Sequence, residues 1–124
     1  MKQYNKISDN RGTFEELFKA SDFFSAEQIS LNIVEPGQKK GGHYHKITHE
    51  VFIVIEGEME VHSNYICENF TTILTLNEKH PTNYVVIPPF TKHFIVSKNG
   101  CKFLVFANKE FDKNNPDTYT DNNT

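Results

Sequence analysis

Residues 37–57 constrain the fold more than any other part of this sequence. They carry His43 and His45, two residues apart, then Glu50, then an unbroken apolar run at 51–55 and a glycine at which we expect a turn. Alternate residues of a strand face the same side, so both imidazoles aim one way. The β-branched and aromatic run is typical of a buried strand. The stretch therefore predicts two histidines and a carboxylate that converge on one cavity.

A fourth side chain can complete this set. Two imidazoles and a carboxylate are one ligand short of a usual transition-metal site. Downstream, Pro88 and Pro89 form a rigid turn that delivers His93 to the start of the apolar segment 94–96. The sequence thus predicts a divalent metal ion held by His43, His45, Glu50 and His93.

The spacing of these residues resembles the cupin family. The first cupin motif is a glycine, five residues, His-x-His, four residues, a glutamate, six residues and a glycine, and residues 37–57 fill it without a gap. The second motif is weaker: Pro88 and His93 fit, but Phe90 replaces a glycine and Ser97 an asparagine. That departure leaves the ligands intact and affects only the turn. The resemblance implies an all-β fold, the double-stranded β-helix or jelly roll.

The rest of the chain agrees with an all-β domain. Short β-branched and aromatic segments alternate with turns, as in a sandwich or small barrel. We expect strands at 13–18, 27–34, 51–55, 69–76, 84–87, 94–96 and 102–107, with 58–62 pairing back beyond Gly57 as a hairpin arm. Residues 21–26 form a connection with room for one helical turn. The length of 124 residues predicts one domain, 1–124, frayed at about 120–124.

Composition limits the partners and the compartment. The formal net charge of −3 gives no electrostatic case for nucleic acid or for a membrane surface. The sequence shows no signal peptide and no apolar run near the length of a membrane span. Cys67 and Cys101 have no motif spacing, and we interpret them as reduced thiols. We therefore expect a cytoplasmic protein.

Strand faces raise the question of a second subunit. Segment 28–33 alternates three aliphatic residues with a polar set, namely Gln28, Ser30 and Asn32. Periodicity allows either set to face inward; if the polar set lines the cavity and contacts substrate, the aliphatic set needs another subunit as cover. Likewise, Glu50 as an inward ligand turns the alternate residues of 51–55 outward, where they would form an apolar stripe. We therefore predict a homodimer.

Arg11 is the only arginine of the chain and lies in a turn that ends at Gly12. A guanidinium is preferred where a carboxylate or a diphosphate must be held through two hydrogen bonds. The alternative is a surface turn residue, and the residue types alone leave both interpretations open.

A closer resemblance covers nearly the whole chain. Four segments occur in order: DNRGTFEE at 9–16, QISLN at 28–32, KGGHYH at 40–45 and FANKEFDKNNPDTY at 106–119. They are similar to the nucleotide-sugar-modifying cupins. The nearest are the C-terminal cupin domain of the bifunctional capsular-polysaccharide epimerase/reductase and the sugar 3,4-ketoisomerases; the dTDP-4-dehydrorhamnose 3,5-epimerases are more distant. The ending at 108–119 is the most specific match.

This resemblance implies an isomerase, an epimerase or ketoisomerase acting at C3 of a UDP- or dTDP-4-keto-6-deoxyhexose in surface polysaccharide biosynthesis. It places the diphosphate at Arg11 and Lys40 and matches His43 with the epimerase general base. The ketoisomerases have a non-ligating residue in place of Glu50, whereas the capsular cupin binds zinc through His, His, Glu and His. Zinc is therefore the first choice of cofactor, with iron, manganese and nickel as alternatives. The chain lacks a reductase domain, so we expect any reduction to come from a separate protein.

The implied chemistry removes the proton from C3, which the neighbouring C4 carbonyl acidifies, while a cation stabilises the enolate. If His43 ligates the cation, another base is needed: His49, Tyr84 or a water molecule on the metal. Two other classes stay open. The first is an iron-dependent oxygenase, which uses the same ligands but leaves Arg11, Lys40 and the segment 108–119 unexplained. The second is a non-catalytic cupin that only binds a sugar or another anion.

Overall fold

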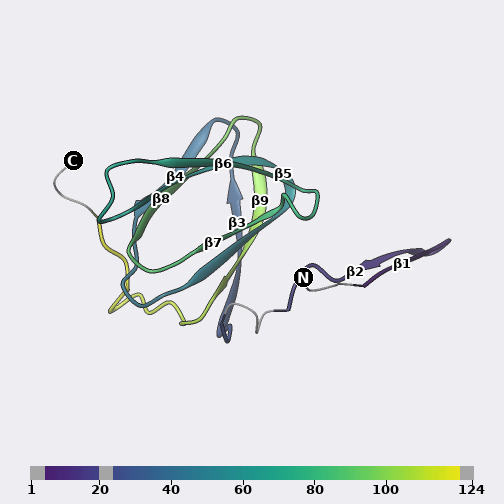
Figure 1. Cartoon of the computed structure of the whole chain (residues 1–124), viewed down its shortest axis with the longest axis horizontal. Coiled ribbons are helices and arrows are strands. Elements are labelled where there is room, and N and C mark those ends of the chain that lie inside the picture. Colours follow the sequence, from purple (N-terminus) through teal and green to yellow (C-terminus); the bar gives the residue numbers. More distant parts are fainter. Residues whose placement is uncertain (1–4, 20–23, 121–124) are drawn as a thin grey trace.

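The computed structural model describes residues 5–19 and 24–120. The regular structure of those residues is all strand: β1 (Lys6–Asp9), β2 (Gly12–Glu15), β3 (Gln28–Val34), β4 (Gln38–His43), β5 (Glu50–Tyr65), β6 (Thr72–Asn77), β7 (Tyr84–Ile87), β8 (Thr91–Ser97) and β9 (Cys101–Ala107). Figure 1 shows β3 to β9 curled around a common interior, with β1 and β2 extending away from it. The expected all-β fold class is confirmed. No described helix is long and apolar enough to cross a membrane.

Strand β5 organises the sheet. It is 16 residues long, and its first half pairs with β7 and β9 whereas its second half pairs with β6 and β8. The outer members are β3, which pairs with β9, and β4, which pairs with β8. One strand thus runs through both walls of the barrel and carries Glu50 at its start.

The expectation of a turn at Gly57, with 58–62 folding back as a hairpin arm, is wrong. Strand β5 continues through Gly57, whose φ is 89°, and its register against β9 shifts between Val54 and Glu56. A Cβ at Gly57 would lie 2.6 Å from the carbonyl oxygen of Gly100. The glycine therefore permits a close approach of two backbones where the long strand bends.

The N-terminal strand is shorter than the expected 13–18 and has a partner that the sequence did not predict. Strand β2 pairs with β1, with Ile7 opposite Phe14, and every residue of this hairpin is exposed. Part of the connection where a helical turn had room, residues 20–23, lies outside the described residues, and 24–26 have no regular structure. Of the tail expected to fray, residues 121–124 also lie outside them.

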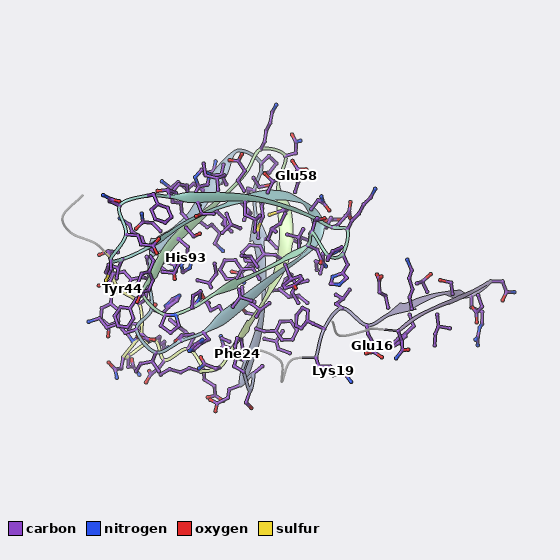
Figure 2. The ribbon with its side chains drawn as sticks, viewed as in Figure 1. Glu16, Lys19, Phe24, Tyr44, Glu58 and His93 are labelled. Atoms are coloured by element: carbon purple, nitrogen blue, oxygen red, sulfur yellow. The ribbon has the colours of Figure 1, made fainter. Side chains whose placement is uncertain are left out.

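Alternate residues of the long strands fill the barrel interior. The buried apolar cluster comprises Val34, Phe52, Val54, Met59, Val61, Leu76, Ile87, Ile95, Cys101, Phe103 and Val105. His93 belongs to the inward row of β8 and is only 3% exposed, with its ring centroid 5.7 Å from that of Phe52. Figure 2 shows His93 inside the barrel and Tyr44 at its edge. The candidate site therefore adjoins the core directly.

The structure decides which face of β3 points inward. Gln28, Ser30 and Asn32 are half-buried. The aliphatic residues point outward, and Ile29, Leu31 and Ile33 are 61%, 57% and 49% exposed. The polar set thus faces the interior, which is the arrangement that leaves an apolar strand face without cover.

The outward face of β5 differs from that of β3. Val51 and Ile53 are 1% and 4% exposed within a single chain. Their cross-strand partners are Phe106 and Tyr84, and the ring of Phe18 lies against both, at centroid distances of 6.5 and 5.3 Å. The N-terminal segment therefore helps to cover this stripe, and these two residues need no second subunit.

Candidate metal centre and substrate cavity

Three histidines converge inside the barrel. His43 is the last residue of β4 and lies opposite His93 of β8, and His45 follows two residues later. The ring centroids of the three pairs are 4.9, 5.0 and 5.4 Å apart. One ring nitrogen of each lies within 4.8 Å of those of the others, so the three could hold a metal ion.

Two glycines allow this convergence. Gly41 and Gly42 have φ angles of 108° and 87°, which L side chains rarely adopt. A Cβ on Gly41 would lie 2.8 Å from the carbonyl oxygen of His93 and 2.9 Å from the Cα of Phe94. The register of β4 against β8 shifts between Gly41 and His43. The close approach and the shift together place His43 opposite His93.

Glu50 completes the cluster from the start of β5. Its Oε1 lies 3.0 Å from Nε2 of His45 and 3.7 Å from Nε2 of His93. Both Oε1 of Glu50 and Nε2 of His45 are buried without a hydrogen bond of acceptable geometry. Buried polar atoms of native proteins are normally satisfied. A cation between them would satisfy both, so the residues present fit a metal ion.

Two of the rings are oriented by backbone carbonyls. Nδ1 of His45 lies 2.6 Å from the carbonyl oxygen of Asp117, and Nδ1 of His93 lies 2.8 Å from that of Thr91. A carbonyl oxygen can only accept, so Nδ1 donates its proton in both cases. In the neutral form of each ring, Nε2 then carries the lone pair and is directed at the cluster, as in metal-binding histidines.

Burial and mutual repulsion set the charges of the histidines. Burial and the neighbouring His93 and His45 lower the pKa of His43 to about 4. Burial lowers the pKa of His93 as well. Burial also acts against protonation of His45, but the Glu50 carboxylate and Asp117 together outweigh it, and the pKa of His45 is raised. At neutral pH His43 and His93 are therefore neutral, the form in which imidazole binds metal.

A cavity of about 110 Å³ adjoins the cluster. It is lined by Asn32, Lys40, Gly41, His43, Glu50, Phe52, His93, Ile95, Phe103 and Val105. Nζ of Lys40 lies 3.4 Å from Oδ1 of Asn32. The cavity thus has apolar walls, a histidine–carboxylate cluster on one side and a cationic group near Asn32.

The other residues proposed from the sequence lie elsewhere. The ring of His49 faces Phe24, with centroids 6.1 Å apart, because its neighbour Glu50 points inward. Tyr84 lies on the outer face of β7, where its ring stacks on His80 and contacts Phe18. Neither lines the cavity, so the structure does not bring these two candidate bases to the histidine cluster.

The two remaining substrate-binding candidates also lie apart. Arg11 sits at the tip of the β1–β2 hairpin, where its guanidinium pairs with Asp9 at 2.7 Å, and its side chain is 87% exposed. In a single chain the hairpin points away from the barrel (Figure 1). Gln28 faces the interior, but its Oε1 accepts a hydrogen bond from the backbone N–H of Phe111 at 2.8 Å. It lines a small hollow on the other side of His45 and Glu50.

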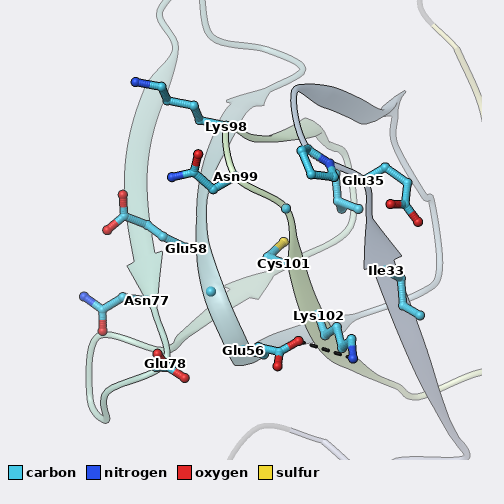
Figure 3. Close-up of a pocket in the computed structure, with 14 residues that line it drawn as sticks. Ile33, Glu35, Glu56, Glu58, Asn77, Glu78, Lys98, Asn99, Cys101 and Lys102 are labelled. Atoms are coloured by element: carbon cyan, nitrogen blue, oxygen red, sulfur yellow. Dashed lines mark ion pairs between the residues drawn. The ribbon is translucent and has the colours of Figure 1, made fainter.

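A larger hollow of about 670 Å³ lies at the end of the barrel where Gly57 meets Gly100. Figure 3 shows its lining, which carries glutamates, asparagines and lysines but no histidine. Glu56 and Lys102 pair there at 3.3 Å. Cys101 is buried, and burial raises the pKa of its thiol, which makes it a poor nucleophile. Size alone does not make this hollow the reactive site.

Sequence reasoning missed Asp117. Its carboxylate accepts hydrogen bonds from the loop between His45 and Glu50, about seventy residues away in the chain. The segment 108–119 stood out as a specific match, but no local pattern connects it with that loop.

Comparisons with known proteins agree with this geometry. The family model of the polysaccharide biosynthesis C-terminal domain matches residues 7–119. The chain is 37% identical over 115 residues to the UDP-2-acetamido-2,6-beta-L-arabino-hexul-4-ose reductase of Pseudomonas aeruginosa, covering 90% of this chain and 30% of that protein. The capsular polysaccharide assembling protein CapF from Staphylococcus aureus matches with a TM-score of 0.71 and 27% identity, over 97% of this chain and 33% of CapF.

A 3,4-ketoisomerase from Helicobacter canadensis shares the fold, with a TM-score of 0.78 and 23% identity over 97% of this chain and 88% of that chain. The chain spans about a third of the first two relatives. The resemblance to capsular and ketoisomerase cupins is confirmed. The chain belongs to the polysaccharide biosynthesis C-terminal domain family and has its cupin-like fold.

Proposed function

We propose that this chain is a metal-dependent isomerase of nucleotide-diphosphate sugars, acting at C3 of a 4-keto-6-deoxyhexose in surface polysaccharide biosynthesis. The observation that carries the proposal is the buried cluster of three histidines and Glu50 beside a small cavity. The relatives support the substrate class. The Pseudomonas relative is named for a UDP-linked hexul-4-ose, and a mutant of the 3,4-ketoisomerase QdtA has been solved in complex with TDP-4-keto-6-deoxyglucose.

The chemistry follows from the position of the cluster against the apolar walls. A divalent ion at His43, His45, Glu50 and His93, with zinc as the first choice, would supply a Lewis acid for the C4 carbonyl oxygen. Phe52, Ile95 and Phe103 exclude water and so strengthen every charge interaction in the cavity. Loss of the C3 proton gives an enolate. Return of a proton to the other face of C3 gives the C3 epimer. Protonation of the enediol form at C4 instead gives the ketoisomer, in which the carbonyl has moved to C3.

The size of the cavity divides the substrate into two parts. Pockets that enclose a drug-sized ligand usually measure roughly 300–1,000 Å³, whereas this cavity measures about 110 Å³. It can enclose the reacting part of one sugar ring. The diphosphate would then lie towards Lys40, with Asn32 beside it, and the nucleoside would lie outside the barrel.

Solvent-deuterium exchange tests the reaction class. We expect metal-loaded protein to incorporate deuterium at C3 of a UDP- or dTDP-4-keto-6-deoxyhexose, as read by NMR, and chelation to stop the exchange. Oxygen uptake without exchange would instead support the oxygenase. Binding without either would leave a non-catalytic cupin and contradict the proposal.

His43→Asn separates the two roles proposed for that histidine. A variant that keeps its metal but loses exchange assigns proton transfer to His43. A variant that loses the metal makes His43 a ligand, and the base is then another group. The metal content is measured on the same sample as the exchange.

Arg11→Lys should weaken nucleotide-sugar binding by about 1–2 kcal/mol, roughly 5–30-fold in Kd. The reason is that an ammonium cannot form the two parallel hydrogen bonds that a guanidinium makes to a diphosphate. Since Arg11 lies on a hairpin that points away from its own barrel, this role requires a second copy of the chain. Calorimetry with UDP or dTDP measures the effect. The control is Lys6→Arg on the same exposed hairpin, which should change nothing. Unchanged affinity in the Arg11 variant would make Arg11 a surface turn residue.

A further inference from the structure

The segment 108–119, here called the C-terminal strap, leaves β9 and runs back across the site end of the barrel. Its backbone and side chains are tied to three earlier parts of the chain: Asn108 to His49, Phe111 to Gln28 and Tyr119 to Tyr44. Tyr119 and Tyr44 exchange two backbone hydrogen bonds, each 2.9 Å long. The strap is thus fixed at both ends, on either side of the connection that joins the candidate ligands His45 and Glu50.

That connection, residues 46–49, joins His45 to Glu50 and has no strand partner of its own. The backbone N–H groups of Lys46, Ile47 and Thr48 all donate to the carboxylate of Asp117, at 3.0, 2.8 and 2.8 Å. The hydroxyl of Thr48 adds a fourth hydrogen bond of 2.9 Å. One carboxylate therefore holds three of the four loop residues between two candidate ligands.

These donors also keep the carboxylate charged. Partial burial acts to raise the pKa of Asp117, but the loop N–H groups outweigh it and lower the pKa to about 2. Hydrogen bonds to a charged group are stronger than those between neutral groups. The hold on the loop is therefore present throughout the physiological range.

Asp117 reaches the ligand set by a second route as well. Its own backbone carbonyl accepts the Nδ1 proton of His45 at 2.6 Å. Thr91 does the same for His93, but from only two residues away on the same strand. For His45 the corresponding carbonyl comes from the far end of the chain, and the carboxylate of the same residue anchors it in place.

We propose that Asp117 is the positioning residue of the metal centre. It holds His45 in the tautomer whose Nε2 faces Glu50, and it sets the path of the loop from His45 to Glu50. The proposal rests on the metal centre of the proposed function but is independent of the sugar reaction. Removal of the carboxylate leaves three loop N–H groups without their acceptor and frees the carbonyl that orients His45.

The test uses Asp117→Ala and the milder Asp117→Asn, with Asp112→Ala as the matched control. Asp112 lies in the same strap, but among the described residues its carboxylate accepts a hydrogen bond only from the backbone N–H of Asn114, within the strap. The first readout is nitrogen NMR of metal-free protein at a pH where His45 is neutral. We expect the Nδ1–H tautomer to be more populated in the parent and the control than in the Asp117 variants, because the Asp117 carbonyl favours it whereas the Glu50 carboxylate, 3.0 Å from Nε2, favours the other tautomer.

The second readout is zinc affinity, measured by competition with a chromophoric chelator. Asp117→Ala should weaken it by roughly 10–100-fold, as is usual for residues that orient a ligand, Asp117→Asn less, and Asp112→Ala not at all. A folded Asp117→Ala protein with the tautomer ratio of the parent and unchanged zinc affinity would overturn the role of Asp117 alone. A parent protein that binds no zinc, iron, manganese or nickel would overturn it together with the proposed function.

Discussion

His45→Ala should abolish metal binding. We expect the parent protein to carry about one divalent ion per chain and the variant to lose at least about 100-fold in zinc affinity, because the loss of a ligand must cost more than the 10–100-fold lost with an outer partner. The structural reason is that Nε2 of His45 is buried 3.0 Å from Oε1 of Glu50, and both atoms are buried without a hydrogen bond of acceptable geometry. Metal analysis after dialysis, followed by zinc titration, measures the effect.

The control removes a histidine from outside the cluster. His62 lies on the outward side of β5, stacked on Phe94 with ring centroids 4.4 Å apart, so His62→Ala should keep its metal. Glu50→Gln keeps the shape of the fourth candidate ligand and removes its charge, and it should weaken binding if the carboxylate ligates. A parent protein without metal that takes up none of zinc, iron, manganese or nickel would contradict the metal centre.

The histidine cluster was predictable because its geometry is mainly local. Alternation on a strand, two glycines and a fixed count of residues to Glu50 put three of the side chains on one side of the chain. His93 required more, since its register opposite His43 depends on the pairing of β4 with β8. The family spacing supplied that part of the prediction.

Phe90 shows how the second cupin motif tolerates a departure. It stands where cupins have a glycine, and its φ of 61° is in the left-handed region that a glycine adopts easily. Such a conformation costs roughly 1–3 kcal/mol for another residue. The ring stacks on Tyr44 with centroids 6.3 Å apart, and the N–H donates to the carbonyl of His45 at 2.7 Å. The turn thus keeps its glycine-like geometry through contacts that no motif contains.

The features that the sequence did not predict depend on long-range contacts. Gly57 has the pattern of a turn because it ends an apolar run, yet Gly100, in the turn before β9, approaches it from elsewhere in the chain. The hold of Asp117 on the ligand loop joins residues about seventy positions apart. The pairing of β1 with β2 was missed because segment 6–9 is short and polar. Local pattern carries no information on such partners, whereas it describes buried strands well.

Two apolar surfaces are uncovered in a single chain, and they form the basis of the predicted homodimer. On β3, the outward row centred on Leu31 is about half exposed or more. On the hairpin, Ile7 and Phe14 face each other across the pair and are 63% and 57% exposed. An isolated two-stranded hairpin is marginal in water. Of the outward residues of β5, Val51 and Ile53 are buried and Ile55 is 46% exposed, so the prediction of a dimer rests on β3 and the hairpin.

A second copy of the chain is the cover that we expect for both surfaces. The hairpin extends away from its own barrel (Figure 1), so it is placed to reach a second copy. In a dimer, the apolar face of each hairpin would pack against the barrel of the other copy. It would also bring Arg11 towards the neighbour's site, which is the condition for the diphosphate role.

Light scattering at micromolar concentration should report a mass near twice 14.4 kDa. Leu31→Asp should reduce it to one chain, because each copy loses roughly 2 kcal/mol of apolar burial and must bury a charge, which weakens the dimer by about 1,000-fold or more. Ile73→Asp is the matched control: Ile73 is 58% exposed on β6, against 57% for Leu31. It should leave the dimer intact. A stable monomer of the parent chain would mean that both apolar surfaces face water, and Arg11 could then not reach a neighbour's cavity.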